Sequence, residues 1–351
     1  MKFNRTMASV LTAGALLSGW IVYRPVRSQA AANQAAARCS ELITIGTETW
    51  PGYLPLYVAQ ENGYFRDEGL KVLVKRYVGL GELSKDYVAG KMQARANLTF
   101  DAVTERLQGV QHQAVLAIDY SNGSDAILAR VGLKGVKDLA GKRVAYEPNT
   151  LEEFFLSWAL HQYGLSLRDV VSVHADPEKT MSMLESGQVD VAVSHEPFLS
   201  KTLRAKKAHA VYSSADAPGL ITDILTIRTD FIESHPEAVQ GLLRAYFRGL
   251  DFWKEHPREA SVILAREFGD TPENVREHMK GITMLNLADN RTAFTFAMGL
   301  QSLYGNMRKI GGFVQEHRGT GGKEAALDTD ALIDARAIRK LFKERASTER
   351  P

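Results

Sequence analysis

The sequence predicts an α/β fold in which mostly parallel strands are flanked by helices. Short runs of apolar and β-branched residues alternate with helical patterns from residue 42 to about residue 212, which is typical of such folds. Similar helix–glycine–strand units at residues 88–94 and 184–191 suggest two related lobes. With 351 residues, the chain is long enough for about two domains.

The stretch from residue 42 to residue 70 shows one such unit clearly. Residues 42–45 form a short apolar strand, and residues 47–52 end it with turn-forming side chains. Pro55 suits a first helical turn, and Gly63 ends the helix. Because ligands bind open α/β sheets where strands lead into helices, we expect binding residues in this turn.

Other elements follow along the rest of the chain. We expect strands at residues 71–77, 114–119, 126–130, 143–146, 170–173, 189–193 and 210–212, and helices at residues 82–89, 135–142 and 151–163. Beyond Pro236 the pattern is mostly helical through Ile310. A last helix is predicted at residues 328–342.

The N-terminus has the order of an export signal. Lys2 and Arg5 precede an apolar run at residues 7–23, and an alanine-rich segment follows. We interpret residues 1–40 as a signal peptide, or as an uncleaved anchor with a linker, because the run is nearly long enough to span a bilayer. Either interpretation places the body in the periplasm or another extracytoplasmic space.

Composition excludes several classes of function. The net charge of +2 gives no electrostatic footprint for nucleic acid. Cys39 is the only cysteine, so an internal disulfide and a zinc site built on several cysteines are excluded. His161, His174 and His195 show no metal-ligand spacing. We therefore expect neither a metal nor a cofactor.

The chain also carries a series of short motifs in a fixed order. They are Gly52 with Pro55, GYFRDEGL at residues 63–70, residues 119–127, LAGKRVA at 139–145, GQVDVAVSHEPF at 187–198 and FIESHPE at 231–237. In this order they resemble the extracytoplasmic solute-binding proteins of the nitrate/sulfonate/taurine class of ABC transporters. Thiamine-pyrimidine synthase-like proteins share that superfamily. Gln93 departs from the pattern, because the family usually carries Asp there.

The resemblance implies a two-lobe type II periplasmic-binding-protein fold with a mostly parallel sheet in each lobe. Lobe I would comprise residues 41–130 and 222–318, and lobe II residues 131–221. Residues 319–351 would form a connector and a helix packed on lobe I. The implied function is a monomeric, non-enzymatic receptor. It would capture a small molecule between the lobes and deliver it to an ABC permease.

Polar turns at strand ends should line the cleft between the lobes. The candidate ligand-binding residues are Glu48, Trp50, Tyr53, Thr99, Asp101, Asp119, Tyr120, Ser121, Glu147, Asn149, Thr150, Glu152, His195, Glu196 and Asp223. Some have structural alternatives. Asn149 or Thr150 can cap the helix that starts near Leu151, with Glu152 and Glu153 in its first turn.

Carboxylates far outnumber cations among these turns, which favours a small nitrogenous cation or zwitterion as the ligand. Trp50, Tyr53 and Tyr120 could hold an amine by cation–π attraction. Binding of nitrate, a sulfonate or taurine by the same mechanism stays open, as does a membrane-tethered sensor. A thiamine-pyrimidine synthase-like enzyme fits less well, because its iron site uses a cysteine-rich motif and Cys39 precedes the fold.

Overall fold

The computed structural model describes residues 41–77, 80–196, 198–204, 206, 208–317 and 327–348. The predicted export segment at residues 1–40 and most of the connector that begins at residue 319 lie outside the described residues. No helix in the described part of the chain is long and apolar enough to cross a membrane.

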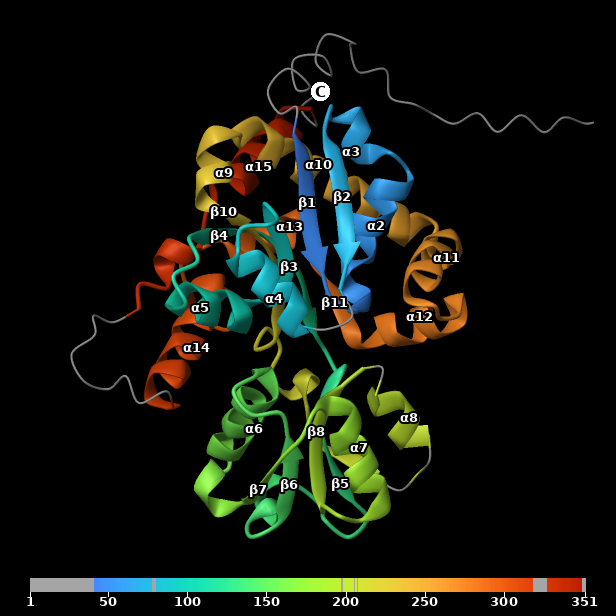
Figure 1. Ribbon diagram of the computed structural model, residues 1–351, viewed down its shortest axis with the longest axis vertical. Helices are drawn as coiled ribbons and strands as arrows, with labels where there is room; N and C mark the ends of the chain where they lie inside the picture. Colours follow the sequence, from blue (N-terminus) through green and yellow to red (C-terminus); the bar gives the residue numbers. More distant parts are fainter. Residues whose placement is uncertain are drawn as a thin grey trace, which may run out of the picture.

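The described residues form two lobes, each built on one sheet (Figure 1). The strands are β1 Leu42–Thr47, β2 Lys71–Arg76, β3 Ala94–Leu98, β4 His112–Ser121, β5 Asp125–Arg130, β6 Arg143–Tyr146, β7 Val171–His174, β8 Val191–His195, β9 Ala208–Ser213, β10 Thr222–Arg228 and β11 Ile282–Met284. Lobe I contains a six-stranded sheet in the order β11-β4-β10-β3-β1-β2. Lobe II contains a five-stranded sheet in the order β7-β6-β8-β5-β9.

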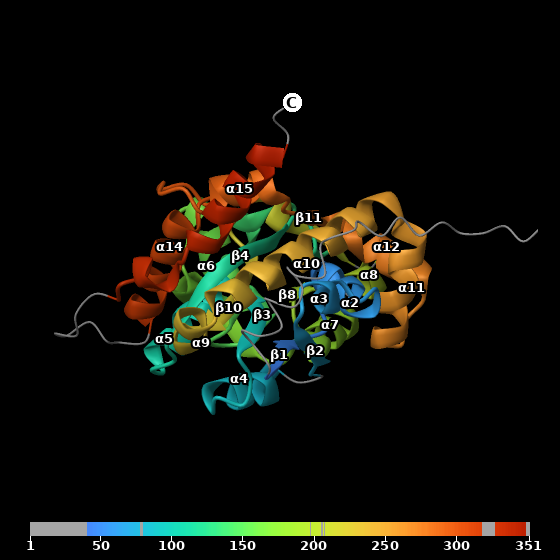
Figure 2. The ribbon, with the colours of Figure 1, turned by 90° about the horizontal axis from the view of Figure 1, so that it is seen from above.

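Helices cover the sheets of both lobes (Figures 1 and 2). Lobe I contains α2 Leu54–Glu61, α3 Tyr64–Asp67, α4 Leu80–Val88, α5 Thr99–Leu107, α9 Thr229–Ser234, α10 Pro236–Glu255, α11 Pro257–Phe268, α12 Pro272–His278, α13 Leu287–Ala293, α14 Leu303–His317 and α15 Arg336–Thr348. Lobe II contains α6 Leu151–Gln162, α7 Pro177–Ser186 and α8 Phe198–Arg204. Short 3-10 turns, among them Pro51–Tyr53 and Ser214–Asp216, connect some of these elements.

The predicted α/β class is confirmed, and both sheets are mixed. In lobe I, β1 is parallel to β2 and β3, whereas β10 runs antiparallel to β3 and β4. In lobe II, β6 is parallel to β7 and β8, whereas β5 runs antiparallel to β8 and β9. Strands β5 and β10 are reversed because the chain enters each of them directly from the other lobe. Their first residues therefore lie beside the last residues of the strands they pair with. Strand β11 also runs antiparallel to β4.

The first crossing between the lobes lies earlier than predicted. We assigned residues up to 130 to lobe I, but β5 pairs with β8 and β9 and so belongs to lobe II. Only Asn122, Gly123 and Ser124 separate β4 from β5. The return crossing follows the 3-10 turn Ser214–Asp216 and leads into β10.

The C-terminal helix also begins later than predicted. We expected it from residue 328, but α15 starts at Arg336, after a 3-10 turn at Asp330–Leu332. The Asp334 carboxylate accepts the backbone N–H of Arg336 at 2.9 Å, which fixes the start of the helix. Helix α15 packs against α10 and α13 of lobe I (Figure 2).

Packing of α10 on α2 holds the first binding turn in place. Gly249 of α10 lies directly against the Pro55 carbonyl group, so that even a Cβ atom there would overlap the backbone of α2. Leu54 and Leu56, on either side of Pro55 in α2, are buried. Because α2 follows Trp50 after one short turn, this helix contact fixes where the turn enters the cleft.

We predict that Gly249→Ala destabilises the protein, although alanine favours helices. Overpacking costs ~1–3 kcal/mol and exceeds the ~1 kcal/mol gained in helix propensity. Gly312→Ala in α14 is the matched control, since nothing lies within 4 Å of its Cβ position. Thermal unfolding should show a lower Tm for the first variant and an equal or higher Tm for the second. Equal Tm values for both variants would contradict the close approach.

Candidate functional site

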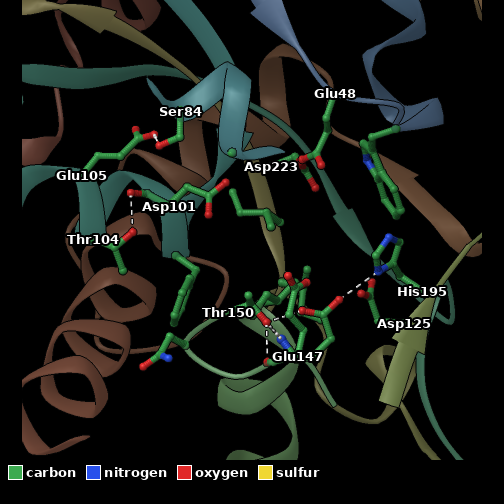
Figure 3. Close-up of a pocket in the computed structure, with 18 of the residues that line it drawn as sticks. Glu48, Ser84, Asp101, Thr104, Glu105, Asp125, Glu147, Thr150, His195 and Asp223 are labelled. Atoms are coloured by element: carbon green, nitrogen blue, oxygen red, sulfur yellow. Dashed lines mark hydrogen bonds and ion pairs between the residues drawn. The ribbon is translucent and has the colours of Figure 1, made fainter. Parts of the chain in front are cut away.

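A cavity of about 240 Å³ lies between the lobes, where strands of both sheets end (Figure 3). Nine of the fifteen predicted binding residues line it: Glu48, Trp50, Asp101, Glu147, Asn149, Thr150, Glu152, His195 and Asp223. Glu48 and Trp50 follow β1, and Asp223 lies near the start of β10. From lobe II, Glu147 precedes α6 and His195 ends β8.

Two further predicted residues lie just behind the cavity wall. The Tyr53 hydroxyl donates to Asp223 Oδ1 at 2.5 Å, and Trp50 Nε1 donates to Asp119 at 3.3 Å. Tyr53 and Asp119 are both fully buried. They therefore support the residues that face the cavity.

The remaining predicted residues have other positions. Thr99 is buried in the first turn of α5, which we had expected to be a loop. Tyr120 lines a separate cavity beside Thr222 and Leu285. The Ser121 hydroxyl lies 2.7 Å from the Ser214 hydroxyl and is buried.

Glu196 was predicted to bind ligand, but it does not line the cavity. Its carboxylate accepts the Ser200 hydroxyl at 2.6 Å and lies 3.4 Å from the His278 ring nitrogen. Ser200 belongs to α8 in lobe II, whereas His278 ends α12 in lobe I. Glu196 therefore joins the two lobes beside the cavity.

Asp119 and Asp223 form a buried pair of carboxyl groups. They lie directly opposite each other on β4 and β10. Such cross-strand partners have Cβ atoms ~5 Å apart, so two negative charges there repel each other. A Cβ atom on Gly52 would overlap the Asp119 carboxylate, so only glycine lets the 3-10 turn pass this close.

Burial is the main reason why this pair holds its protons. Burial raises the pKa of Asp119 to about 8, against a lowering effect of the hydrogen bond from Trp50. Burial, followed by the negative charge of Asp119, raises the pKa of Asp223 well above its ordinary value. Near neutral pH the pair therefore does not carry two full negative charges.

Glu48 and Asp125 add two more carboxyl groups to the cavity lining, Glu48 beside Asp223 and Asp125 beside His195 (Figure 3). Burial, with repulsion from Asp101, raises the pKa of Glu48 to about 7. Burial also raises the pKa of Asp125 to about 6, although the positive charge of His195 opposes the shift. These groups would be stabilised in their charged form by a cation.

Glu152 and His195 form an ion pair on the lobe II side. The two side chains are 3.0 Å apart, and Thr150 Oγ1 donates to the other carboxylate oxygen of Glu152 at 2.5 Å. Burial alone would lower the pKa of His195, but the hydrogen bond and charge of Glu152 raise it to about 9. Burial opposes the shift at Glu152, yet His195 and Thr150 hold the pKa of Glu152 below its usual value.

Backbone N–H groups at and just before the start of α6 are bonded to the chain's own side chains. Thr150 caps the helix by accepting the Glu152 backbone N–H. The Glu153 carboxylate accepts the Asn149 backbone N–H at 2.7 Å. Asn149 has a left-handed φ of 63°, which asparagine tolerates well. A helix start arranged in this way offers little room for an oxyanion.

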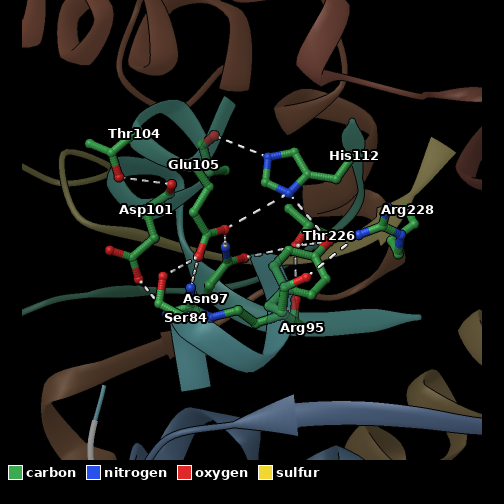
Figure 4. A network of polar contacts seen from close by, with 11 residues as sticks. Ser84, Arg95, Asn97, Asp101, Thr104, Glu105, His112, Thr226 and Arg228 are labelled. Atoms are coloured by element: carbon green, nitrogen blue, oxygen red, sulfur yellow. Dashed lines mark hydrogen bonds and ion pairs between the residues drawn. The ribbon is translucent and has the colours of Figure 1, made fainter. Parts of the chain in front are cut away.

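Arg95 forms part of a buried polar network on the lobe I side (Figure 4). Arg95 and Glu105 form an ion pair in which both side chains are only 2% exposed, and Asp101 lies 3.1 Å from the guanidinium. Asn97 donates to Glu105, and Thr226 of β10 donates to Asn97. The network ties β3, α5 and β10 together beneath the cavity.

Sequence reasoning missed several lining residues. These are Thr49, Gly81, Ser84, Arg95, Leu98, Phe100, Thr104, Glu105, Asp125, Leu151 and Ile221. Two of them carried a signal. Arg95 interrupts an apolar strand between two alanines, and Asp125 starts a strand directly after the predicted crossing segment.

The described residues contain no cluster of three or more His, Cys, Asp or Glu side chains suited to a metal ion. The cavity's carboxyl groups are instead distributed around an organic-sized space (Figure 3). This arrangement suits a small organic ligand with a positively charged group.

Two bacterial relatives have names that concern binding. A protein of Bacillus subtilis (strain 168) named for binding aliphatic sulfonates is 26% identical over 254 residues, covering 71% of this chain and 76% of the relative. The taurine-binding periplasmic protein of Escherichia coli (strain K12) is 24% identical over 240 residues, covering 66% of this chain and 75% of the relative.

A relative from Candida albicans (strain WO-1) has the name of an enzyme, 4-amino-5-hydroxymethyl-2-methylpyrimidine phosphate synthase. It is 25% identical over 228 residues, covering 61% of this chain and 67% of the relative. The relatives therefore include both binding proteins and an enzyme.

The fold is that of a solved binding protein. The periplasmic aliphatic sulphonate binding protein SsuA from Escherichia coli matches with a TM-score of 0.70 at 16% identity, covering 84% of this chain and 97% of that structure. This likeness confirms the predicted periplasmic-binding-protein fold. The family described as NMT1/THI5 like matches residues 50–260, which is more than half of the chain. The chain therefore belongs to the NMT1/THI5-like family, alongside the solute-binding proteins of the nitrate/sulfonate/taurine class.

Proposed function

We propose that this protein is an extracytoplasmic solute receptor of an ABC importer. It captures a small nitrogenous organic cation or zwitterion between its lobes and delivers it to the permease. The family and the names of the bacterial relatives support the receptor role. A periplasmic relative and the signal-like sequence of residues 1–40 support the extracytoplasmic location.

The charge balance of the cavity is the main observation that supports a cationic or zwitterionic ligand. Seven carboxylate side chains are among the described residues that line it, against two basic side chains, Arg95 and His195. Both basic side chains already have carboxylate partners, Glu105 and Glu152 respectively. Without a ligand, burial favours the protonated form of several remaining acidic groups, and a cationic ligand would stabilise their charged form instead.

The same features argue against an anionic ligand. A sulfonate or nitrate ion is held best by free backbone N–H groups or unpaired basic side chains. At the start of α6 the Thr150 hydroxyl accepts the Glu152 backbone N–H, and the Glu153 carboxylate accepts that of Asn149 just before the helix. Arg95 is paired with Glu105. The names of the relatives therefore describe those proteins' ligands and are a weaker guide to this one.

A binding role fits the site better than the enzyme role of the Candida albicans relative. The only cysteine, Cys39, precedes β1, whereas the enzyme type that the sequence resembles uses a cysteine-rich iron motif. The carboxyl groups line a cavity between two lobes, an arrangement suited to closing around a ligand.

Ligand screening tests the sign of the ligand charge. We expect organic ammonium compounds to raise the Tm of the purified protein in a thermal shift panel that also contains taurine, alkylsulfonates and nitrate. A ligand at 100 times its Kd should stabilise by ~2.7 kcal/mol. Stabilisation by nitrate or an alkylsulfonate alone would refute the cation proposal and leave the receptor proposal standing.

A matched pair of variants tests whether the cavity carboxylates bind the ligand. We expect Glu48→Gln to weaken binding of the best ammonium ligand by ~1–3 kcal/mol, the range for a lost charge-assisted hydrogen bond. Glu273→Gln removes the same charge from the exposed surface of α12, where Glu273 pairs with Arg276. Isothermal titration should show little change for this control. Equal effects of the two substitutions would indicate only a general charge effect.

Stability should also depend on pH in an unusual direction. Carboxyl groups with a raised pKa keep their protons in the folded state but lose them in the unfolded chain near pH 4. The ligand-free protein should therefore lose stability as the pH rises from about 4 to about 8, the range between the ordinary pKa of a carboxyl group and the raised pKa values of Glu48, Asp125 and Asp119. Asp223→Asn should reduce this loss. A pH dependence in urea unfolding that is identical in both proteins would contradict the buried acidic cluster.

A further inference from the structure

Two buried carboxylate oxygens beside the cavity have no hydrogen-bond partner among the described residues. They are Asp125 Oδ2 and Asp223 Oδ2. The two residues are only 5% and 1% exposed, and both line the cavity. Such atoms are uncommon in native structures, because a buried oxygen without a donor loses its hydrogen bonds to water.

Three nearby polar groups are already bonded to other atoms, although the buried Ser124 hydroxyl beside Asp125 is also without a partner in the described part of the chain. The Tyr53 hydroxyl donates to Asp223 Oδ1, and the Trp50 ring nitrogen donates to Asp119. Ser214 Oγ accepts the backbone N–H of Asp125 rather than donating to its carboxylate oxygen Oδ2. Because both residues line the cavity, a ligand held there is a candidate source of the missing donors.

The two oxygens come from different lobes. Asp125 begins β5 of lobe II, and Asp223 lies near the start of β10 of lobe I. Glu48, which follows β1, lies beside Asp223 in the cavity wall (Figure 3). The three acceptors line one cavity, so a ligand group that bonds to all of them would join both lobes.

We propose that the charged end of the ligand is a primary ammonium or an amidinium-type group that donates N–H bonds to Asp125 Oδ2, Asp223 Oδ2 and Glu48. The inference rests on the proposed function and narrows it. A primary ammonium has three N–H donors and an amidinium has four, whereas a quaternary ammonium has none. The site therefore selects for N–H groups and not for positive charge alone.

The rest of the cavity indicates what the charged group is attached to. Leu98, Phe100, Leu151 and Ile221 line it together with the Trp50 ring. These side chains provide an apolar surface for a short hydrocarbon skeleton, either aliphatic or aromatic. A compact ligand with one N–H-rich cationic end and an apolar body matches both parts.

A comparison of three aromatic cations with different numbers of N–H donors tests this proposal. Benzylammonium, benzamidinium and benzyltrimethylammonium share an aromatic body and one positive charge but differ in N–H donors. By isothermal titration near pH 8, where the carboxyl groups are more fully ionised, we expect the first two to bind at least about tenfold more tightly than the third. Equal binding of the trimethyl compound would overturn the N–H proposal and leave the cation proposal intact. Failure of all three to bind, with binding of alkylsulfonates instead, would overturn both.

Substitutions assign the selectivity to the unpartnered oxygens. Asp125→Asn and Asp223→Asn should each reduce the preference for benzylammonium over benzyltrimethylammonium by about fivefold or more, because an acceptor is lost or neutralised. Glu147→Gln is the matched control. It removes a charge from the cavity but no unpartnered oxygen, so it should weaken both ligands alike and keep their ratio.

Circular dichroism and thermal unfolding separate these effects from misfolding. Because Asp125 and Asp223 are buried acids, their amide variants should be folded and at least as stable as the parent near pH 8. Folded variants with an unchanged ligand ratio would overturn the assignment to these two oxygens.

Discussion

The opposition of Asp119 and Asp223 on adjacent strands is the constraint around which the site is organised. Two carboxyl groups face each other in the interior of lobe I, where burial disfavours their charged forms. The Trp50 ring N–H donates to Asp119, and the Tyr53 hydroxyl donates to Asp223. Gly52 lies between them in the sequence and has no side chain to overlap the Asp119 carboxylate. The turn after β1 is thus shaped by the need to satisfy buried acids, and an apolar side chain at either position would leave an oxygen without its donor.

The path of the chain places this acidic cluster at the junction of the lobes. Asp119 lies near the end of β4 and Asp125 begins β5, only a few residues later but in the other lobe. Asp223 lies where the chain returns. Rotation of one lobe against the other would therefore change the distance between Asp125 and the acidic groups of lobe I. Where these groups are ionised, their repulsion favours an open arrangement, and a bound cation favours a closed one.

Much of the fold could be predicted because it rests on local patterns. Apolar periodicity and glycine positions indicated most strands and helices, and motif order indicated the two lobes. The first crossing was misplaced because β4 and β5 are both apolar and nothing in their sequence shows which sheet each strand joins. Nine of the predicted binding residues line the cavity, since strand ends meet there. Glu196 and Tyr120 also follow or end strands, but their side chains turn toward His278 and a separate cavity. Side-chain direction of this kind depends on tertiary packing.

The contact between Glu196 and His278 has a practical consequence. Glu196 lies just before α8 of lobe II, and His278 ends α12 of lobe I. The Glu196 carboxylate and the His278 ring nitrogen are 3.4 Å apart, so the distance between α8 and α12 should change when the lobes move. The natural sequence has a single cysteine, Cys39, which lies before β1. After its replacement, cysteines introduced on the exposed surfaces of α8 and α12 could carry a fluorescent dye pair. The protein would then serve as an optical sensor for its own ligand, without any contact between the dyes and the cavity.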